Sequence, residues 1–291
     1  MTSPDLGRVG VWGHLDSLPV AAARNYVRRV ETLGYGALWV PETVGREPFA
    51  LLGLLAGETS RLVLGTSIVS IWGRDAQSTR MSAETLAEAT TGRFVLGLGV
   101  SHPHLAAKLR GHVFDRPLTR MREYLAAYRS AVYKGPHDDS HEPPILVAAL
   151  RERMTDLAAT DADGAFPYLV TPERVAWMRA RLDAAAAGNR PTLAVTLPVA
   201  LDGPDAARAY LKPYLRTPTY HASWELQGFA ADDWEAPGSD RLVAEMVATG
   251  SVADARQRIE ELHAAGADHV AVIPVAPDGT TEHLPTLEAL A

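Results

Sequence analysis

The fold assignment starts from the stretch Gly92-Arg-Phe-Val-Leu-Gly-Leu-Gly-Val-Ser-His102. It has the composition of a short buried strand, with glycines at Gly97 and Gly99, and it ends on Ser101 and His102. Because glycine packs no side chain, its presence inside a strand indicates either that backbone or ligand comes close or that the strand bends there. A titratable histidine directly beyond such a strand lies where parallel sheets place their active sites. The stretch therefore predicts a buried strand that leads into a functional site.

Short apolar strands of this kind alternate with helical segments along the chain. The predicted strands are Arg8–Trp12, Ala37–Val40, Leu62–Val69, Phe94–Gly99, Ile145–Ala148, Asp163–Phe166, Leu193–Leu201 and His269–Ile273. The predicted helices are Val20–Leu33, Pro48–Glu58, Ala76–Thr90, Pro117–Val132, Arg151–Ala159, Thr171–Ala187, Pro204–Leu215 and Ser251–Ala265, with a short helix at the C-terminus. Continuous apolar strands joined by helices indicate a parallel sheet that is buried on both faces. The number of strands and the chain length favour a closed barrel, so we predict an α/β fold, a (β/α)8 TIM barrel that forms one domain over residues 1–291.

One segment, Arg216–Asp240, interrupts the alternation after the seventh predicted strand. It is rich in proline and aromatic residues, among them Tyr220, Trp224, Phe229 and Trp234. Long connections in compact domains are commonly functional, so we interpret residues 216–240 as an insertion that forms a lid or a substrate wall. The alternative is a packed surface loop without a function of its own.

The composition indicates a globular protein with a large core, because 47% of the 291 residues are hydrophobic. The net charge of −7 argues against nucleic acid as a partner. The absence of cysteine excludes disulfides, thiol catalysis and thiolate metal sites, and it fits a reducing cytoplasm. The N-terminus lacks the apolar core of a signal peptide, and no stretch approaches the roughly 20 apolar residues of a membrane span. We therefore expect a cytoplasmic protein that acts on a small molecule and does not bind membranes.

The residues at the predicted strand ends exclude several chemistries. A Schiff-base enzyme needs a lysine at a strand end, but the lysines of this chain lie in predicted helices or loops. The His102-Pro-His104 motif has no carboxylate beside it, so we expect no metal site. The chain also lacks a G-x-S-x-G nucleophile motif. His102 remains as a candidate acid or base and Glu42 as a candidate carboxylate, in a setting that suits a flat, apolar cofactor.

Four motifs follow one another in order on the predicted strands. They are Gly34-Tyr-Gly-Ala-Leu-Trp-Val-Pro-Glu42, Leu64-Gly-Thr-Ser-Ile-Val69, Gly92-Arg-Phe-Val-Leu-Gly-Leu-Gly99, and Pro143-Pro-Ile-Leu-Val-Ala148 followed by Ala162-Asp-Gly164. With these motifs the chain resembles the luciferase-like monooxygenase superfamily over nearly its whole length, and in particular the branch that uses the deazaflavin coenzyme F420. The resemblance implies a (β/α)8 barrel with an insertion, and it implies a homodimer, which is a frequent assembly in this family.

The resemblance also implies where a cofactor would bind. In the family, the third strand has a bulge with a non-prolyl cis peptide behind the isoalloxazine ring, and the matching bond here is Ser67–Ile68. Ser70 would hydrogen-bond the edge of the ring, and the backbone of Val100 and Ser101 would contact it. The residues that match the phosphate site are Leu150, Arg151, Arg153 and Met154. They open a predicted helix, whose free N–H groups and dipole attract anions, although in the alternative interpretation the two arginines only face solvent.

The chain departs from the sugar-phosphate dehydrogenases of this family, which carry Asp-His after the second strand and Glu after the fourth. The corresponding positions here are Glu42-Thr43 and His102. The catalytic histidine of that branch is therefore missing, which disfavours a sugar phosphate as substrate. The fourth strand still ends on an acid or base, because imidazole titrates near neutral pH. Alternatively, His102 is a structural histidine that bonds a loop carbonyl.

We therefore expect a coenzyme F420-dependent oxidoreductase that transfers a hydride between the deazaflavin and a C=C, C=N or C=O bond of a small organic substrate. His102 would move the proton, and Glu42 would polarise or hydrogen-bond the cofactor or the substrate. The predicted substrate wall consists of Trp12, Trp72, Trp224 and Phe229. Two alternatives stay open, an FMN-dependent luciferase-like monooxygenase and a non-catalytic barrel that only binds a cofactor.

Overall fold

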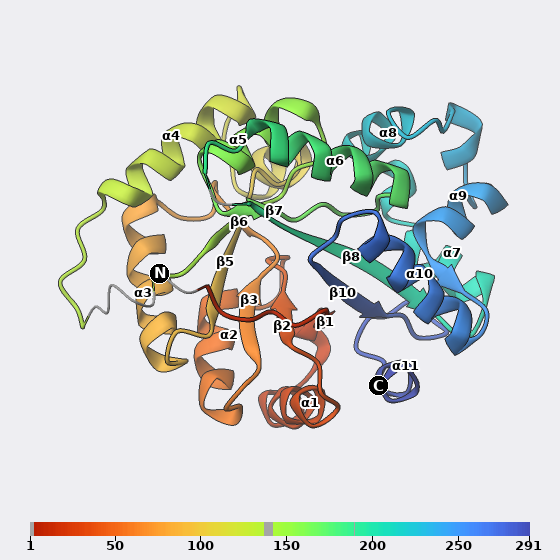
Figure 1. The fold of residues 1–291 in the computed structure, drawn as a ribbon, viewed down its shortest axis with the longest axis horizontal. Coiled ribbons are helices and arrows are strands. Elements are labelled where there is room, and N and C mark those ends of the chain that lie inside the picture. The colour runs from red at the N-terminus through yellow and green to blue at the C-terminus, as the bar shows by residue number, and fades with distance from the viewer. Residues whose placement is uncertain (1–2, 137–141, 189) are drawn as a thin grey trace.

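Eight parallel strands close into a barrel in the computed structural model, which describes residues 3–136, 142–188 and 190–291. In order around the barrel they are β1 (Val9–Trp12), β2 (Ala37–Val40), β3 (Val63–Thr66), β5 (Phe94–Gly99), β6 (Ile145–Val147), β7 (Gly164–Ala165), β8 (Thr192–Ala200) and β10 (His269–Pro274). Because β10 pairs in parallel with both β8 and β1, the sheet closes on itself (Figure 1). The predicted (β/α)8 barrel is confirmed.

Helices surround the barrel on its outside, as the alternating pattern predicted (Figure 1). They are α1 (Val20–Thr32), α2 (Pro48–Leu55), α3 (Ala76–Ala89), α4 (Pro117–Ser130), α5 (Glu152–Thr160), α6 (Pro172–Ala185), α10 (Val252–Ala264) and α11 (Leu284–Leu290). Local signals set their ends. The side chains of Ser251 and Asp254 cap α10 reciprocally, and Gly34 follows α1 at a φ of +88°. None of the helices in the described ranges is long and apolar enough to cross a membrane.

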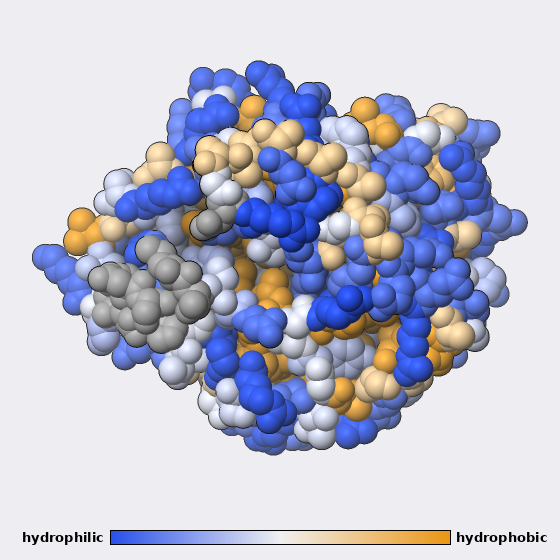
Figure 2. All heavy atoms as spheres, in the orientation of Figure 1, coloured by the Kyte–Doolittle hydropathy of each residue, from blue (hydrophilic) through white to orange (hydrophobic). Residues whose placement is uncertain are grey.

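Alternation along the barrel strands divides the apolar side chains between two cores. Leu96 belongs to the cluster beneath the outer helices, whereas Val95 belongs to a second cluster that includes Trp39. Successive side chains of a strand point to opposite faces, so Gly97 and Gly99 lie on the same face as Val95. The face in Figure 2 is mostly hydrophilic, and its hydrophobic side chains gather in the hollowed middle and in small patches elsewhere.

The predicted third strand, Leu62–Val69, is interrupted in the structure. It consists of β3, a cis peptide bond between Ser67 and Ile68, and the short β4 (Val69–Ser70), which pairs with the end of β5. The bulge and the cis bond that the family resemblance implied are therefore present.

The glycines of β5 make room for this interrupted strand. A Cβ atom at Gly97 would overlap the carbonyl oxygen of Thr66. A Cβ atom at Gly99 would lie 2.5 Å from Cδ1 of Ile68. Close approach is thus the correct interpretation of both glycines, and the group that approaches them is the neighbouring strand of the protein.

The connection from β8 to α10 contains the predicted insertion. It consists of α7 (Pro204–Leu211), α8 (Pro218–Glu225), α9 (Asp240–Met246) and β9 (Ala248–Thr249), which pairs with β8. In Figure 1 these helices lie together at one side of the barrel. The predicted helix Pro204–Leu215 ends earlier, at Leu211, because Pro213 has no N–H group with which to continue it. Within residues 216–240, Trp224 and Phe229 are buried in the same cluster as the barrel interior.

Candidate functional site

A cavity of about 1540 Å³ opens at the carboxyl ends of the barrel strands. Its wall includes the end of β1 and residues that follow β2, β3, β5, β6 and β7, together with residues of α5, α6, α8 and α9. Active sites of such barrels form at this end, because the loops that follow the strands converge there. The volume exceeds what one drug-sized ligand needs, so a cofactor and a substrate fit together.

Most of the residues selected from the sequence line this cavity. They are Trp12, Glu42, Ser67, Ile68, Val100, Ser101, His102, Leu150, Arg151, Arg153, Met154 and Phe229. Three others, Ser70, Trp72 and Trp224, lie outside its wall. The segment 216–240 supplies part of the wall, as the insertion hypothesis requires.

The three residues outside the wall lie behind residues that form it. Ser70 is buried in β4, where its hydroxyl accepts a hydrogen bond from the backbone N–H of Trp72 at 3.3 Å. Trp72 in turn donates from Nε1 to the carbonyl oxygen of Val100 at 2.9 Å. Trp224 is fully buried beside Tyr220, with 5.9 Å between the ring centroids. The prediction that Trp72 and Trp224 line the substrate wall is therefore wrong, because both rings support the wall from behind.

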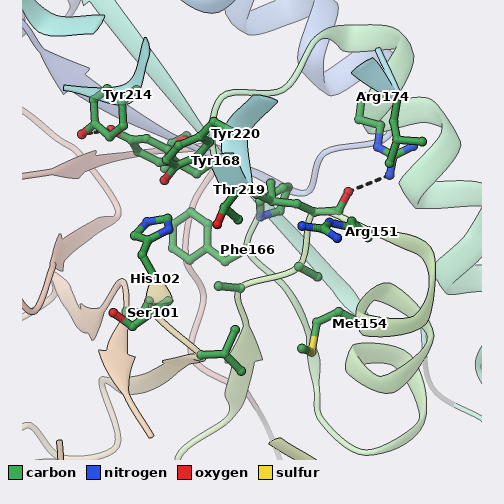
Figure 3. A pocket seen from close by; sticks show the side chains of 18 of the residues that line it. Ser101, His102, Arg151, Met154, Phe166, Tyr168, Arg174, Tyr214, Thr219 and Tyr220 are labelled. Atoms are coloured by element: carbon green, nitrogen blue, oxygen red, sulfur yellow. Dashed lines mark hydrogen bonds between the residues drawn. The ribbon is translucent and has the colours of Figure 1, made fainter. Parts of the chain in front are cut away.

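His102 reaches into the cavity from the loop after β5 and lies beside Tyr220 (Figure 3). Its ring centroid is 5.3 Å from that of Tyr220 and 5.8 Å from that of His104. Burial, together with the charge of His104, lowers the pKa of His102 to about 4, so the imidazole is neutral at pH 7. Its Nδ1 atom is buried, and the ring has no hydrogen-bond partner among the described residues. The alternative of a structural histidine bonded to a loop carbonyl therefore does not hold.

The carboxylate of Glu42 is surrounded by donors from the protein itself. Oε2 accepts hydrogen bonds from the backbone N–H of Ser70 at 2.6 Å and from Arg74 Nη1 at 3.0 Å. Oε1 accepts from Arg110 Nη2 at 2.6 Å and from Arg74 Nη2 at 3.2 Å. The catalytic and cofactor-binding roles of Glu42 stay predictions. These contacts give the carboxylate a second role, which is to join the segments that follow β4 and β5.

The wall next to His102 is built from tyrosines that the sequence prediction did not select. Tyr168 follows β7, and Tyr214 and Tyr220 lie in the connection after α7. Tyr210 of α7 hydrogen-bonds to this group but does not line the cavity. The hydroxyl of Tyr168 donates to Tyr214 at 2.8 Å and shares a short hydrogen bond with Tyr210. Burial raises the pKa of all four phenols, so their hydroxyls stay protonated. The signals in the sequence were the position of Tyr168 after a strand and that of Tyr220 in the aromatic segment 216–240, because contacts between distant hydroxyls leave no local pattern.

The end of the cavity away from His102, where Figure 3 shows Arg151 and Arg174, is cationic, because three arginines outnumber the two glutamates that line it, Glu152 and Glu173. Arg151 precedes the first turn of α5, whose N-terminus has no side-chain cap. The side chains of Arg151 and Arg153 make no ion pair or hydrogen bond within the described ranges. Arg174 in the first turn of α6 donates to the carbonyl oxygen of Leu150 at 2.7 Å, and its guanidinium lies 3.7 Å from the ring centroid of Trp177. Its Nε atom is buried and unpartnered. Three guanidinium groups and the free N–H groups of α5 make this end suitable for a phosphate.

The floor between the two ends is apolar and includes Ile68, Val100, Ala148 and Ala149. A flat ring fits such a floor, and a phosphate-bearing tail fits the cationic end. The residues present therefore suit a flavin or a deazaflavin. In the part of the chain that the structure describes, no group of three or more His, Cys, Asp or Glu side chains is arranged to hold a metal ion.

Comparisons with known proteins identify relatives of this chain. Residues 4–269 match the luciferase-like monooxygenase family. A protein of Mycobacterium tuberculosis that is provisionally named a coenzyme F420-dependent oxidoreductase is 27% identical, with 82% of this chain and 79% of the relative covered. The F420-dependent tetrahydromethanopterin reductase of Methanopyrus kandleri has a similar structure, with a TM-score of 0.75 at 16% identity over 98% of this chain and 97% of that chain. The type II Baeyer–Villiger monooxygenase of Pseudomonas putida, in complex with FMN, gives a TM-score of 0.73 at 16% identity over 97% and 96% of the two chains. At these identities the two structures support the fold alone.

Proposed function

Because the chain belongs to the luciferase-like monooxygenase family, a family of enzymes, we propose that it is an oxidoreductase that uses coenzyme F420 to act on a small organic substrate. The observation that carries this proposal is the cavity, which combines an apolar floor, a cationic end and a neutral imidazole in one space. The mycobacterial relative supports the choice of cofactor, and the family match supports the class of enzyme.

The cavity offers separate places for the two parts of such a cofactor. Ile68, Val100 and Ala148 would contact the flat ring, and Arg151 and Arg153 would bind the negatively charged tail. When bound, the deazaflavin carries the hydride that is exchanged with a C=C, C=N or C=O bond.

His102 has the properties of a group that moves a proton at this site. Its imidazole is neutral at physiological pH, lies on the cavity wall, and has no competing partner among the residues described. A neutral imidazole accepts the proton that a hydroxyl or amine loses on oxidation. The imidazolium that results is the acid for the reverse direction.

An FMN-dependent monooxygenase is the second candidate. The Pseudomonas putida structure that resembles this fold contains FMN. The cationic end would also accept the single phosphate of that cofactor.

Titration of the purified protein with each cofactor distinguishes the two candidates. We expect F420 to bind more tightly than FMN, as measured by fluorescence. The double variant Arg151→Gln/Arg153→Gln should weaken F420 binding, because it removes two charge-assisted contacts to the tail.

The matched control is Arg29→Gln, which removes an exposed arginine that pairs with Glu288 far from the cavity. It should leave the dissociation constant of F420 unchanged. Tighter binding of FMN, together with oxygen-dependent turnover, would overturn the proposal in favour of the monooxygenase.

A further inference from the structure

The wall next to His102 is a continuous aromatic surface. Tyr168 lies between Trp12 and Tyr220, with centroid distances of 6.1 and 5.9 Å. Tyr214 packs edge-on against Tyr220 at 5.3 Å and lies 5.4 Å from Tyr168. All four of these rings line the cavity. The four rings therefore form one broad surface on which a flat ring can pack. They do not form a cage of separate rings around a cation.

The hydroxyls of Tyr168, Tyr210 and Tyr214 hydrogen-bond to one another. Tyr168 donates to Tyr214 and shares a hydrogen bond with Tyr210, and Tyr210 is also a hydrogen-bond partner of Tyr214. Each of the three hydroxyls therefore has an acceptor within the group. His102 has no hydrogen-bond partner among the described residues, so its neutral ring keeps one N–H group that can be donated to a ligand in the cavity.

Charged side chains line the cavity elsewhere. They come from α5 and the residue before it, from α6 and from α9, namely Arg151, Glu152, Arg153, Glu173, Arg174, Arg241 and Glu245. The remaining carboxylate, Glu42, is already paired with two arginines. Among the described residues, the titratable ring in contact with these tyrosines is His102, which is uncharged at neutral pH, and the ring of His14 stacks on Trp12. A charged group that entered this end would lose its hydration without gaining a partner, which is unfavourable.

We propose that the end of the cavity formed by Trp12, Tyr168, Tyr214 and Tyr220 binds a neutral ring-bearing carbonyl compound. The ring packs on the aromatic wall, and the carbonyl oxygen accepts a hydrogen bond from the imidazole of His102. This assignment rests on the proposed function of the same cavity and adds the substrate class to it. The connection between β8 and α10 thereby selects the substrate, because it supplies Tyr214 and Tyr220.

Three probes that share one acetyl-substituted ring test the proposal. They are acetophenone, the anion 4-acetylbenzoate and the cation 4-acetyl-N,N,N-trimethylanilinium. Binding of each to the protein saturated with F420, and to the protein alone, is measured by titration calorimetry or by ligand-observed NMR. We expect the affinity for acetophenone to be at least about tenfold higher than that for either ion, because the ions would lose their hydration without gaining a charged partner.

Two variants assign the preference to the wall. Tyr220→Ala should weaken acetophenone binding by about tenfold, since it removes a packed ring. His102→Ala removes the hydrogen-bond donor and should weaken binding about three- to tenfold, the effect of one hydrogen bond. The control is Tyr35→Phe, in which the lost hydroxyl donates to Leu287 away from the cavity. It should leave the affinity for acetophenone unchanged.

The outcomes separate this proposal from the function on which it rests. If either ion binds as tightly as acetophenone, if no probe binds in the millimolar range, or if Tyr220→Ala has no effect, the neutral-ring assignment is overturned. The F420 titration in the same samples reports on the cofactor. If F420 does not bind but acetophenone still binds more tightly than both ions, the proposed cofactor is rejected and the proposed substrate class stands.

Discussion

Arg110 Nη2 donates to Glu42 Oε1 at 2.6 Å, and this ion pair joins the turn after β2 to the loop after β5. The loop carries His102 into the cavity and contains a short π-helical turn, Leu105–Leu109. Arg74, which follows β4, binds the same carboxylate from its other side. The segments that follow β2, β4 and β5 are thus joined at the buried side chain of Glu42. These ion pairs fix the loop that positions the imidazole of His102.

Replacement of Glu42 by glutamine tests this role. Glu42→Gln removes the charge partner of Arg110 and one of the two charge partners of Arg74, and we expect the free energy of unfolding to fall by about 2–4 kcal/mol. The expected loss is below that of a fully buried pair, because the Arg110 side chain is 26% exposed. Urea denaturation followed by circular dichroism measures the change.

The matched control is Glu47→Gln. Glu47 pairs with the same Arg74 at 2.8 Å, but its side chain is 48% exposed. We expect a loss below about 1 kcal/mol, as for surface ion pairs. Equal losses in the two variants would show that Glu42 is no more than a surface partner of Arg74.

Removal of the His102 imidazole should lower turnover much more than cofactor affinity. For His102→Ala we expect kcat/KM to fall by about 100-fold or more, the usual contribution of a general acid or base. The dissociation constant of F420 should stay close to that of the parent protein. Parallel losses in both quantities would mean that the imidazole belongs to the cofactor site.

The pH dependence of the reaction follows from the lowered pKa of His102. In the direction in which the imidazole accepts a proton, kcat/KM should rise as the pH rises through about 4 and reach a plateau below neutral pH. His104→Gln removes a nearby positive charge and should therefore move the rising limb to higher pH. A pH–rate profile of both proteins checks this, and a limb that does not move would exclude coupling between the two histidines.

Features set by local sequence were predictable for this protein. β2 and β5 have the predicted bounds, because each is a short apolar run between turn residues. His102 and Arg151 line the cavity because a barrel places the residues after its strands at one end. The break between β3 and β4 came only from the family resemblance, since Leu62–Val69 has the pattern of one continuous strand.

Features set by tertiary contacts were not predictable. Nothing local distinguishes Trp72 and Trp224, which support the wall, from Trp12, which lines it. Arg174 has the sequence context of an exposed helical arginine, and only the packing of α6 against α5 brings it to the carbonyl oxygen of Leu150. Such positions depend on the angle between elements, which the periodicity of either element does not encode.

A second buried histidine makes the stability of the barrel sensitive to acid. Trp39 Nε1 donates to His269 Nε2 at 2.9 Å, and His269 Nδ1 donates to the carbonyl oxygen of Gly7 at 2.8 Å. Burial lowers the pKa of His269 to about 4. In the unfolded chain the pKa is about 6.5, so between these values only the unfolded chain binds the proton. The free energy of unfolding should therefore fall as the pH falls from about 6.5 to 4, by about 3 kcal/mol from this residue.

The variant His269→Gln isolates this contribution. Glutamine can accept from Trp39 and donate to Gly7 but carries no titratable group. We expect a shallower loss of stability between pH 6.5 and 4 than in the parent protein, measured by urea denaturation across that range. His112→Gln, which changes an exposed histidine, should retain the parent slope. An unchanged slope in His269→Gln would contradict the assignment.

Arg174 should contribute to cofactor affinity through its fixed guanidinium. Arg174→Lys removes the planar group that stacks on Trp177 and bonds the carbonyl oxygen of Leu150, and we expect F420 to bind about tenfold more weakly. Arg181→Lys is the control, because Arg181 on the same helix pairs with Asp156 of α5. It perturbs the packing of the two helices without removing a cavity guanidinium, so its F420 affinity should match that of the parent protein. Equal weakening in both variants would attribute the effect to helix packing and remove Arg174 from the anion site.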